Sequence, residues 1–138
     1  MELLIENNGV RLLSGEKRLV LEAERAKLIY HLDTGIFDFE SSGLLVLREA
    51  YSGAVEESGG NILSTQGTRK LAGYTEIQDE LGNGLQMTVT TEESKLKLSQ
   101  TFTVYRNKSY VLTSLELEGS EGVSTNYMAP VLAVDRGI

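Results

Sequence analysis

Residues 95–104 read Lys-Leu-Lys-Leu-Ser-Gln-Thr-Phe-Thr-Val, and this stretch decides the fold class. Its apolar side chains share one parity, at Leu96, Leu98, Phe102 and Val104, whereas lysine, serine and threonine take the other parity. Successive side chains of a strand point to opposite faces of a sheet, so a period of two predicts a strand that is buried on one face.

The same alternation recurs in two neighbouring stretches, although Leu112 breaks it in the second. Their apolar members are Leu85, Met87, Val89, Val111, Leu115 and Leu117. The residues Gly82-Asn83-Gly84 tolerate positive φ angles and predict a turn that folds Leu71–Gln78 back onto Leu85–Thr91. A second turn is expected at 106–109, and a third connection at 119–122.

Residues 19–32 allow a helical alternative, because Leu-Glu-Ala-Glu-Arg-Ala-Lys-Leu is a good set of helix formers. Two strands are preferred, because Lys27–Leu32 leads directly into the turn residues Asp33-Thr34-Gly35 and then into Phe37 and Phe39. The fold class expected is all-β, an antiparallel β-sandwich of the supersandwich type with little helix. Eight to twelve strands are expected, in a single domain that spans residues 1–138.

The net charge of the chain is −7, and no run of lysine and arginine is longer than two residues. A protein surface that binds nucleic acid or an anionic membrane needs clustered positive charge, so neither partner is expected. The chain contains no cysteine and no apolar stretch long enough to span a bilayer. No secretory signal is recognised at the start, so the cytoplasm is the expected location.

Candidates for chemistry are few. The single histidine, His31, has no recognisable nucleophile and acid to complete a triad, and a surface or partly buried strand histidine is expected. Carboxylates are paired at 56–57, 79–80 and 92–93, and at Asp38 and Glu40. Of these pairs, only Asp38 and Glu40 have a spacing that puts both groups on one face of a strand, as a glycosidase pair would require. Solvated carboxylates are the preferred interpretation, so no catalytic residue, metal or cofactor is expected.

The C-terminal third carries a resemblance to a known family. Residues 100–118, QTFTVYRNKSYVLTSLELE, are followed by Asn126-Tyr-Met-Ala-Pro130. Together they resemble the N-terminal β-supersandwich of glycoside hydrolase family 36, the melibiase-type α-galactosidases; residues 27–52 resemble it only loosely. The family's catalytic carboxylates lie on a (β/α)₈ barrel of about 250 residues, for which this chain is too short. No catalytic residue is therefore carried over.

The resemblance implies a fragment of a larger protein: a non-catalytic accessory domain that packs against a catalytic barrel of the same parent chain. Contacts with that barrel, or with the rim of its sugar pocket, are expected at Tyr51, Asn126, Tyr127 and Met128. The further partners that the resemblance implies are carbohydrate bound by the parent protein and other copies of the chain in a homo-oligomer. One alternative is an independent, lectin-like carbohydrate-binding module, with weak affinity for free galactosides because the chain has no tryptophan. A mutarotase-like enzyme is a third hypothesis. Pro130 is expected at a sheet edge or a bend.

Overall fold

The computed structural model describes residues 1–55, 61–93, 96–119, 122–123 and 127–133. Side chains are described up to residue 118, except at 45, 46, 54, 55 and 61. The described residues contain thirteen strands, connected by turns, and no helix. No helix in this part of the chain could therefore cross a membrane.

The strands follow one another closely along the chain. They are β1 (Glu2–Asn7), β2 (Val10–Ser14), β3 (Arg18–Glu22), β4 (Ala26–His31), β5 (Ile36–Ser41), β6 (Leu44–Val55), β7 (Asn61–Leu63), β8 (Thr68–Asp79), β9 (Gly82–Glu93), β10 (Leu96–Tyr105), β11 (Val111–Gly119), β12 (Gly122–Val123) and β13 (Tyr127–Ala133).

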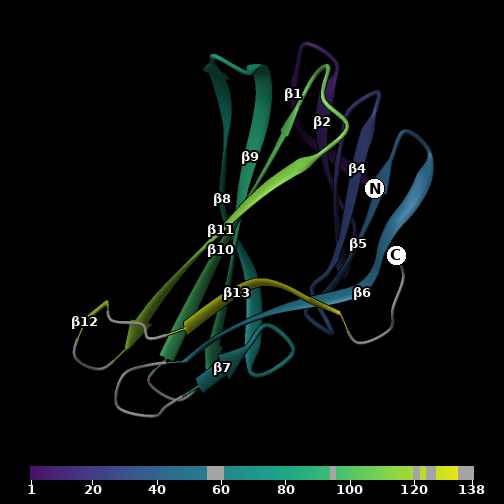
Figure 1. Ribbon diagram of the computed structural model, residues 1–138. Helices are drawn as coiled ribbons and strands as arrows, with labels where there is room; N and C mark the ends of the chain where they lie inside the picture. Colours follow the sequence, from purple (N-terminus) through teal and green to yellow (C-terminus); the bar gives the residue numbers. More distant parts are fainter. Residues whose placement is uncertain (56–60, 94–95, 120–121, 124–126, 134–138) are drawn as a thin grey trace.

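These strands form two antiparallel sheets that face each other as a β-sandwich (Figure 1). Sheet A has eight strands in the order β1-β2-β3-β4-β5-β6-β13, and β7 also pairs with β6. Sheet B has five strands in the order β12-β11-β10-β9-β8. Most pairs join strands that are neighbours in sequence, whereas β13 returns from the end of the chain to pair with β6.

The expected all-β sandwich is confirmed. Residues 19–32 form the two strands β3 and β4 rather than a helix, and Leu71–Gln78 pairs with Leu85–Thr91 as predicted. The strand number exceeds the expected range by one, because β7 and β12 have only three and two residues, too few for a periodic pattern. Pro130 lies in β13, the last strand in the order of sheet A, where the register shifts between Ala129 and Leu132. The prediction of an edge or bend is thus confirmed.

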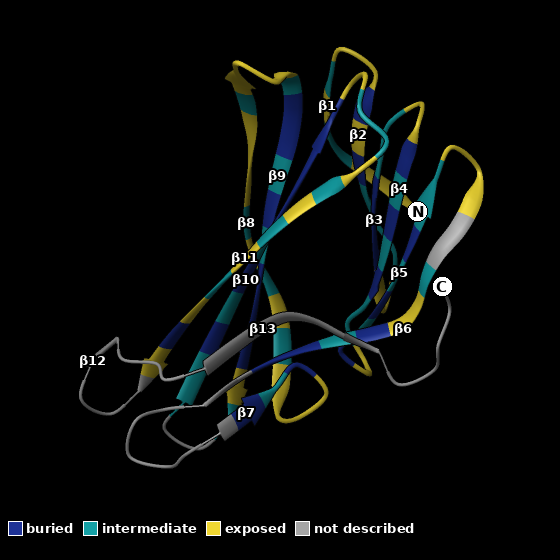
Figure 2. Cartoon of the chain, in the orientation of Figure 1, coloured by how far each residue is buried: buried dark blue, intermediate teal, exposed yellow. Residues whose placement is uncertain are grey.

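The main hydrophobic core lies between the sheets, along the inward parity of each strand (Figure 2). At its centre are Tyr30 and Phe37 of sheet A, whose rings stack with centroids 6.0 Å apart, and Phe102 of sheet B, which meets both rings edge-on. A smaller cluster of Ile62, Leu98 and Leu117 lies towards the other end. Aromatic contacts of this kind add to the free energy gained by burial.

A layer of buried polar groups separates the two apolar clusters. On β10, Gln100 lies between Phe102 of the first cluster and Leu98 of the second. Its Oε1 accepts a hydrogen bond of 2.7 Å from Ser52 Oγ on the opposite sheet. The Ser64 hydroxyl accepts from the Ser52 backbone N–H at 2.9 Å and donates to the carbonyl of Gly35 at 2.8 Å. These bonds satisfy groups that would otherwise be costly to bury.

Arg69 of β8 joins two loops through backbone carbonyls alone. Its Nε donates to the oxygen of Leu32 at 2.8 Å, and Nη2 donates to that of Asp33 at 2.7 Å. Its Nη1 donates to the carbonyls of Ser64 and Gln66. The planar guanidinium can serve four acceptors at once, which a lysine ammonium cannot do in this geometry. Arg69 therefore fixes the β4–β5 and β7–β8 loops to sheet B.

Replacing Ser64 with alanine is expected to lower the free energy of unfolding by about 1–3 kcal/mol, because the two buried hydrogen bonds of the Ser64 hydroxyl, with Ser52 and Gly35, are lost. Urea denaturation measures the change. The matched control is Ser114→Ala on an exposed position of β11, with an expected effect within about 0.5 kcal/mol. Equal effects of the two substitutions would contradict the role assigned to the network.

Two glycines with similar backbone angles should respond differently to alanine. Gly35 has a φ of +76°, and an added Cβ would lie 1.7 Å from the carbonyl oxygen of Ser64. Gly43 has a φ of +82° but open space around it. Gly43→Ala is expected to cost about 1–2 kcal/mol from backbone conformation alone. Gly35→Ala should cost more than about 4 kcal/mol, since the backbone itself must move. Thermal denaturation of both variants tests this difference.

Candidate functional site

The residues predicted to contact a partner domain lie on paired strands. Tyr51 is half-buried in β6, opposite Leu132 of β13. Tyr127 and Met128 lie in β13 opposite Val55 and Ala54. The pairing thus brings β6 and β13 together, but it places Tyr51 and Tyr127 at different positions along the pair. The side chains of Tyr127 and Met128, and all of Asn126, lie outside the described residues.

His31, Asp38 and Glu40 all lie on the outer face of sheet A, because their neighbours Tyr30, Phe37 and Phe39 point into the core. The Asp38 carboxylate accepts a hydrogen bond of 2.8 Å from the Glu49 backbone N–H, and its other oxygen lies 3.4 Å from His31 Nε2.

The expectation of a partly buried strand histidine is confirmed. Within the described residues no nucleophile is hydrogen-bonded to His31, and no group of three potential metal ligands is present. The contact between His31 and Asp38 therefore links β4 to β5 near the turn that connects them, and it does not form part of a triad among the described residues.

The outer face of sheet B is polar. Gln86 Nε2 donates to Thr103 Oγ1 at 3.1 Å, and the hydroxyls of Thr88 and Thr101 are 3.2 Å apart. Leu112 also lies on this face, with 44% of its surface exposed. A polar outer face is the usual arrangement for a sandwich in contact with water.

The outer face of sheet A is different, because it carries a row of apolar side chains across four strands. The register aligns Leu3, Leu13, Val20 and Ile29 directly opposite one another on β1 to β4. Their sequence neighbours Leu12, Leu19, Leu21 and Leu28 fill the core, so the row points outward. We call these four residues the apolar row. Leu3 is 49% exposed, whereas Val20 is covered by its neighbours.

A ladder of alternating charges runs beside the apolar row. The register places Glu6, Arg11, Glu22, Lys27 and Glu40 opposite one another across β1 to β5. Arg11 and Glu22 form a salt bridge. Opposite charges on directly facing strand positions stabilise a sheet modestly, so the ladder favours this register while remaining accessible to water.

Figure 1 shows the β1–β2 turn and the tip of the β8–β9 hairpin at the same end of the sandwich. A polar cleft lies there, lined by residues of both segments. Its volume is about 300 Å³, and its lining consists of Asn7, Asn8, Glu76, Ile77, Gln78 and Asn83. Glu76 and Gln78 face Leu85 and Asn83 across the strand pair. They therefore extend the inner face of sheet B beyond the last buried layer, and the cleft is a continuation of the space between the sheets.

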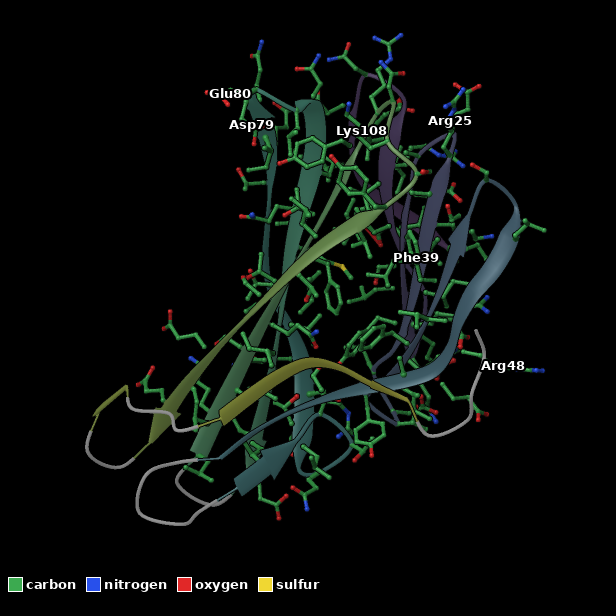
Figure 3. All side chains as sticks on the ribbon, viewed as in Figure 1. Arg25, Phe39, Arg48, Asp79, Glu80 and Lys108 are labelled. Carbon is green, nitrogen blue, oxygen red and sulfur yellow. The ribbon has the colours of Figure 1, made fainter. Side chains whose placement is uncertain are left out.

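Several hydrogen bonds fix the walls of this cleft. Asn7 Nδ2 donates to the carbonyl of Gly84 at 3.1 Å, which ties sheet A to sheet B, and Asn8 Nδ2 donates to Asn7 Oδ1. The Tyr105 hydroxyl donates to Asp79 Oδ2 at 2.8 Å. Figure 3 shows Asp79 at the tip of the hairpin, next to Glu80. Burial, together with the Asp79 carboxylate, raises the pKa of Tyr105 to about 12.

The cleft was not predicted from the sequence. Asn83 was assigned only a turn role, and Asn7, Asn8 and Gln78 carried no pattern of their own. The one available signal was the gathering of asparagine around glycine in both turns, at 7–9 and 82–84. That signal predicts turns, but it does not predict that the two turns meet in space.

Comparison with known proteins identifies no relative. No protein-family model, curated protein or solved structure matches this chain.

Replacing Tyr105 with phenylalanine is expected to cost about 1.5–3 kcal/mol, since a hydrogen bond to a carboxylate is lost. The ordinary tyrosine pKa is 10, so below pH 10 the hydroxyl is protonated in both the folded and the unfolded chain, and its contribution is fully present. As the pH rises towards 12, the folded form retains a proton that the unfolded chain releases, and stability falls.

Urea denaturation from neutral pH to above pH 10 should therefore show a shallower alkaline loss for Tyr105→Phe than for the unmodified protein. Burial also raises the pKa of Tyr30 to about 12, so part of the loss should persist in this variant. An unchanged alkaline slope would show that the hydroxyl of Tyr105 is not held as described.

Proposed function

We propose that this chain is a non-catalytic accessory domain of an α-galactosidase-like glycoside hydrolase, and that the outer face of sheet A packs against the catalytic barrel of the same parent protein. The observation that carries the proposal is the apolar row. The outer face of sheet B carries threonine and glutamine together with Leu112, whereas that of sheet A carries a continuous row of leucine, valine and isoleucine. An outward apolar row flanked by polar residues is typical of an interaction surface.

The energetics favour covering the row. Burying a leucine or isoleucine side chain fully contributes about 1.5–3 kcal/mol, and Leu3, Leu13 and Ile29 are still partly or largely exposed. The charge ladder beside the row would form the polar rim of such an interface, where charged residues are tolerated because water reaches them.

Following the family resemblance, we also propose that Tyr51, Asn126, Tyr127 and Met128 shape the rim of the parent's sugar pocket. A chain without cysteine needs no oxidising compartment for its stability, and cytoplasmic location is part of the proposal.

Methyl-group NMR with a soluble paramagnetic probe tests the docking surface. In the isolated chain the methyl signals of Leu3, Leu13 and Ile29 should broaden, and in the intact parent protein they should be protected. Leu112, 44% exposed on the outer face of sheet B, is the internal control and should broaden in both. Continued broadening of Leu3 and Ile29 in the parent, or protection of Leu112 instead, would overturn the assignment of this surface.

A further inference from the structure

We infer that the polar cleft at the end of the sandwich binds a neutral, polyhydroxylated ligand of monosaccharide size. The cleft lies at the mouth between the sheets, whereas the apolar row lies on the outer face of sheet A. The inference therefore does not depend on docking to a second domain. The volume of the cleft, about 300 Å³, is at the lower limit for sites that bind small molecules.

The lining offers unused hydrogen-bonding groups of both kinds. The side-chain amides of Gln78 and Asn83 form no hydrogen bond with any other described residue, and neither does the Glu76 carboxylate. Asn8 uses one of its two amide protons on Asn7, and its own carbonyl oxygen accepts none within the described chain. An amide both donates and accepts, while a carboxylate only accepts.

This set of groups selects the ligand class by exclusion. Glu76 is the only charged residue of the lining, so an anionic ligand would be repelled, and the lining offers no second carboxylate to hold a cation. A metal ion needs several oxygen ligands of its own, and no such group occurs among the described residues. Ile77 is the only apolar residue of the lining, and no aromatic residue belongs to it, which disfavours planar or apolar ligands.

A compact molecule with many hydroxyls satisfies these groups best, because each hydroxyl can donate to Glu76 or to an amide oxygen and accept from an amide N–H. The cleft is also held open before binding. Asn7 is anchored to Gly84, and the hairpin tip is anchored by Tyr105 to Asp79. Preorganisation lowers the entropy cost of binding. The absence of a stacking ring from the lining keeps the expected affinity in the millimolar range.

Titration of the ¹⁵N-labelled protein with methyl galactoside and methyl glucoside, followed by NMR, tests the inference. Saturable shifts are expected at Asn7, Asn8, Gln78 and Asn83. A double variant, Gln78→Ala with Asn83→Ala, should bind about tenfold more weakly, because two hydrogen-bonding partners are lost. Asn107→Ala removes an exposed amide outside the cleft and should leave binding unchanged. Glucuronate, which is anionic, should bind more weakly than either neutral sugar.

The spectrum of each variant reports directly whether the fold is intact. Three outcomes would overturn the inference: no saturable shift with either neutral sugar, shifts centred away from the cleft, or equal affinity for the double variant and the unmodified protein. None of these outcomes bears on docking through the apolar row, which is measured by the methyl experiment. The two proposals can therefore fail separately.

Discussion

The structure depends on buried polar contacts that hold the two sheets in one relative position. Apolar packing alone tolerates many arrangements of one sheet on another, whereas a buried hydrogen bond is satisfied in few of them. The bond from Ser52 to Gln100 crosses the middle of the sandwich, and Arg69 fastens the loops of sheet A to β8. At the far end, Asn7 reaches Gly84. These ties also position the surfaces to which we assign a function.

The two assigned surfaces follow from the same alternation of side chains. Where the strands overlap, inward residues build the core and outward residues leave one polar face and one partly apolar face. Where the β8–β9 hairpin extends past the core, its inward positions are Glu76, Gln78 and Asn83, and a cleft replaces packing. The core thus ends in the polar cleft, while the outer face of sheet A carries the apolar row.

Much of the fold could be predicted because alternation is a local property. The parity of 96, 98, 102 and 104 identified the inner face of β10 correctly, but Gln100 on the same parity was overlooked, since a buried glutamine is justified only by partners on other strands. The outward position of Val20 could not be predicted either. Residues 19–21 are all apolar, and only their pairing with β2 shows which of them points to the core and which to the outer face. The cleft joins turns that lie more than seventy residues apart.

The order of the strands has a consequence for how the protein folds. From β1 to β6 and from β8 to β12, each strand pairs with its neighbour in the chain, so these pairings need only short loops to close. Closing a loop costs more entropy as it lengthens, and all-β proteins fold slowly when distant strands must meet first. Here both meanders can assemble locally. The pairing of β13 with β6 and the docking of the two sheets are the long-range events, and they are the steps that should limit the rate of refolding.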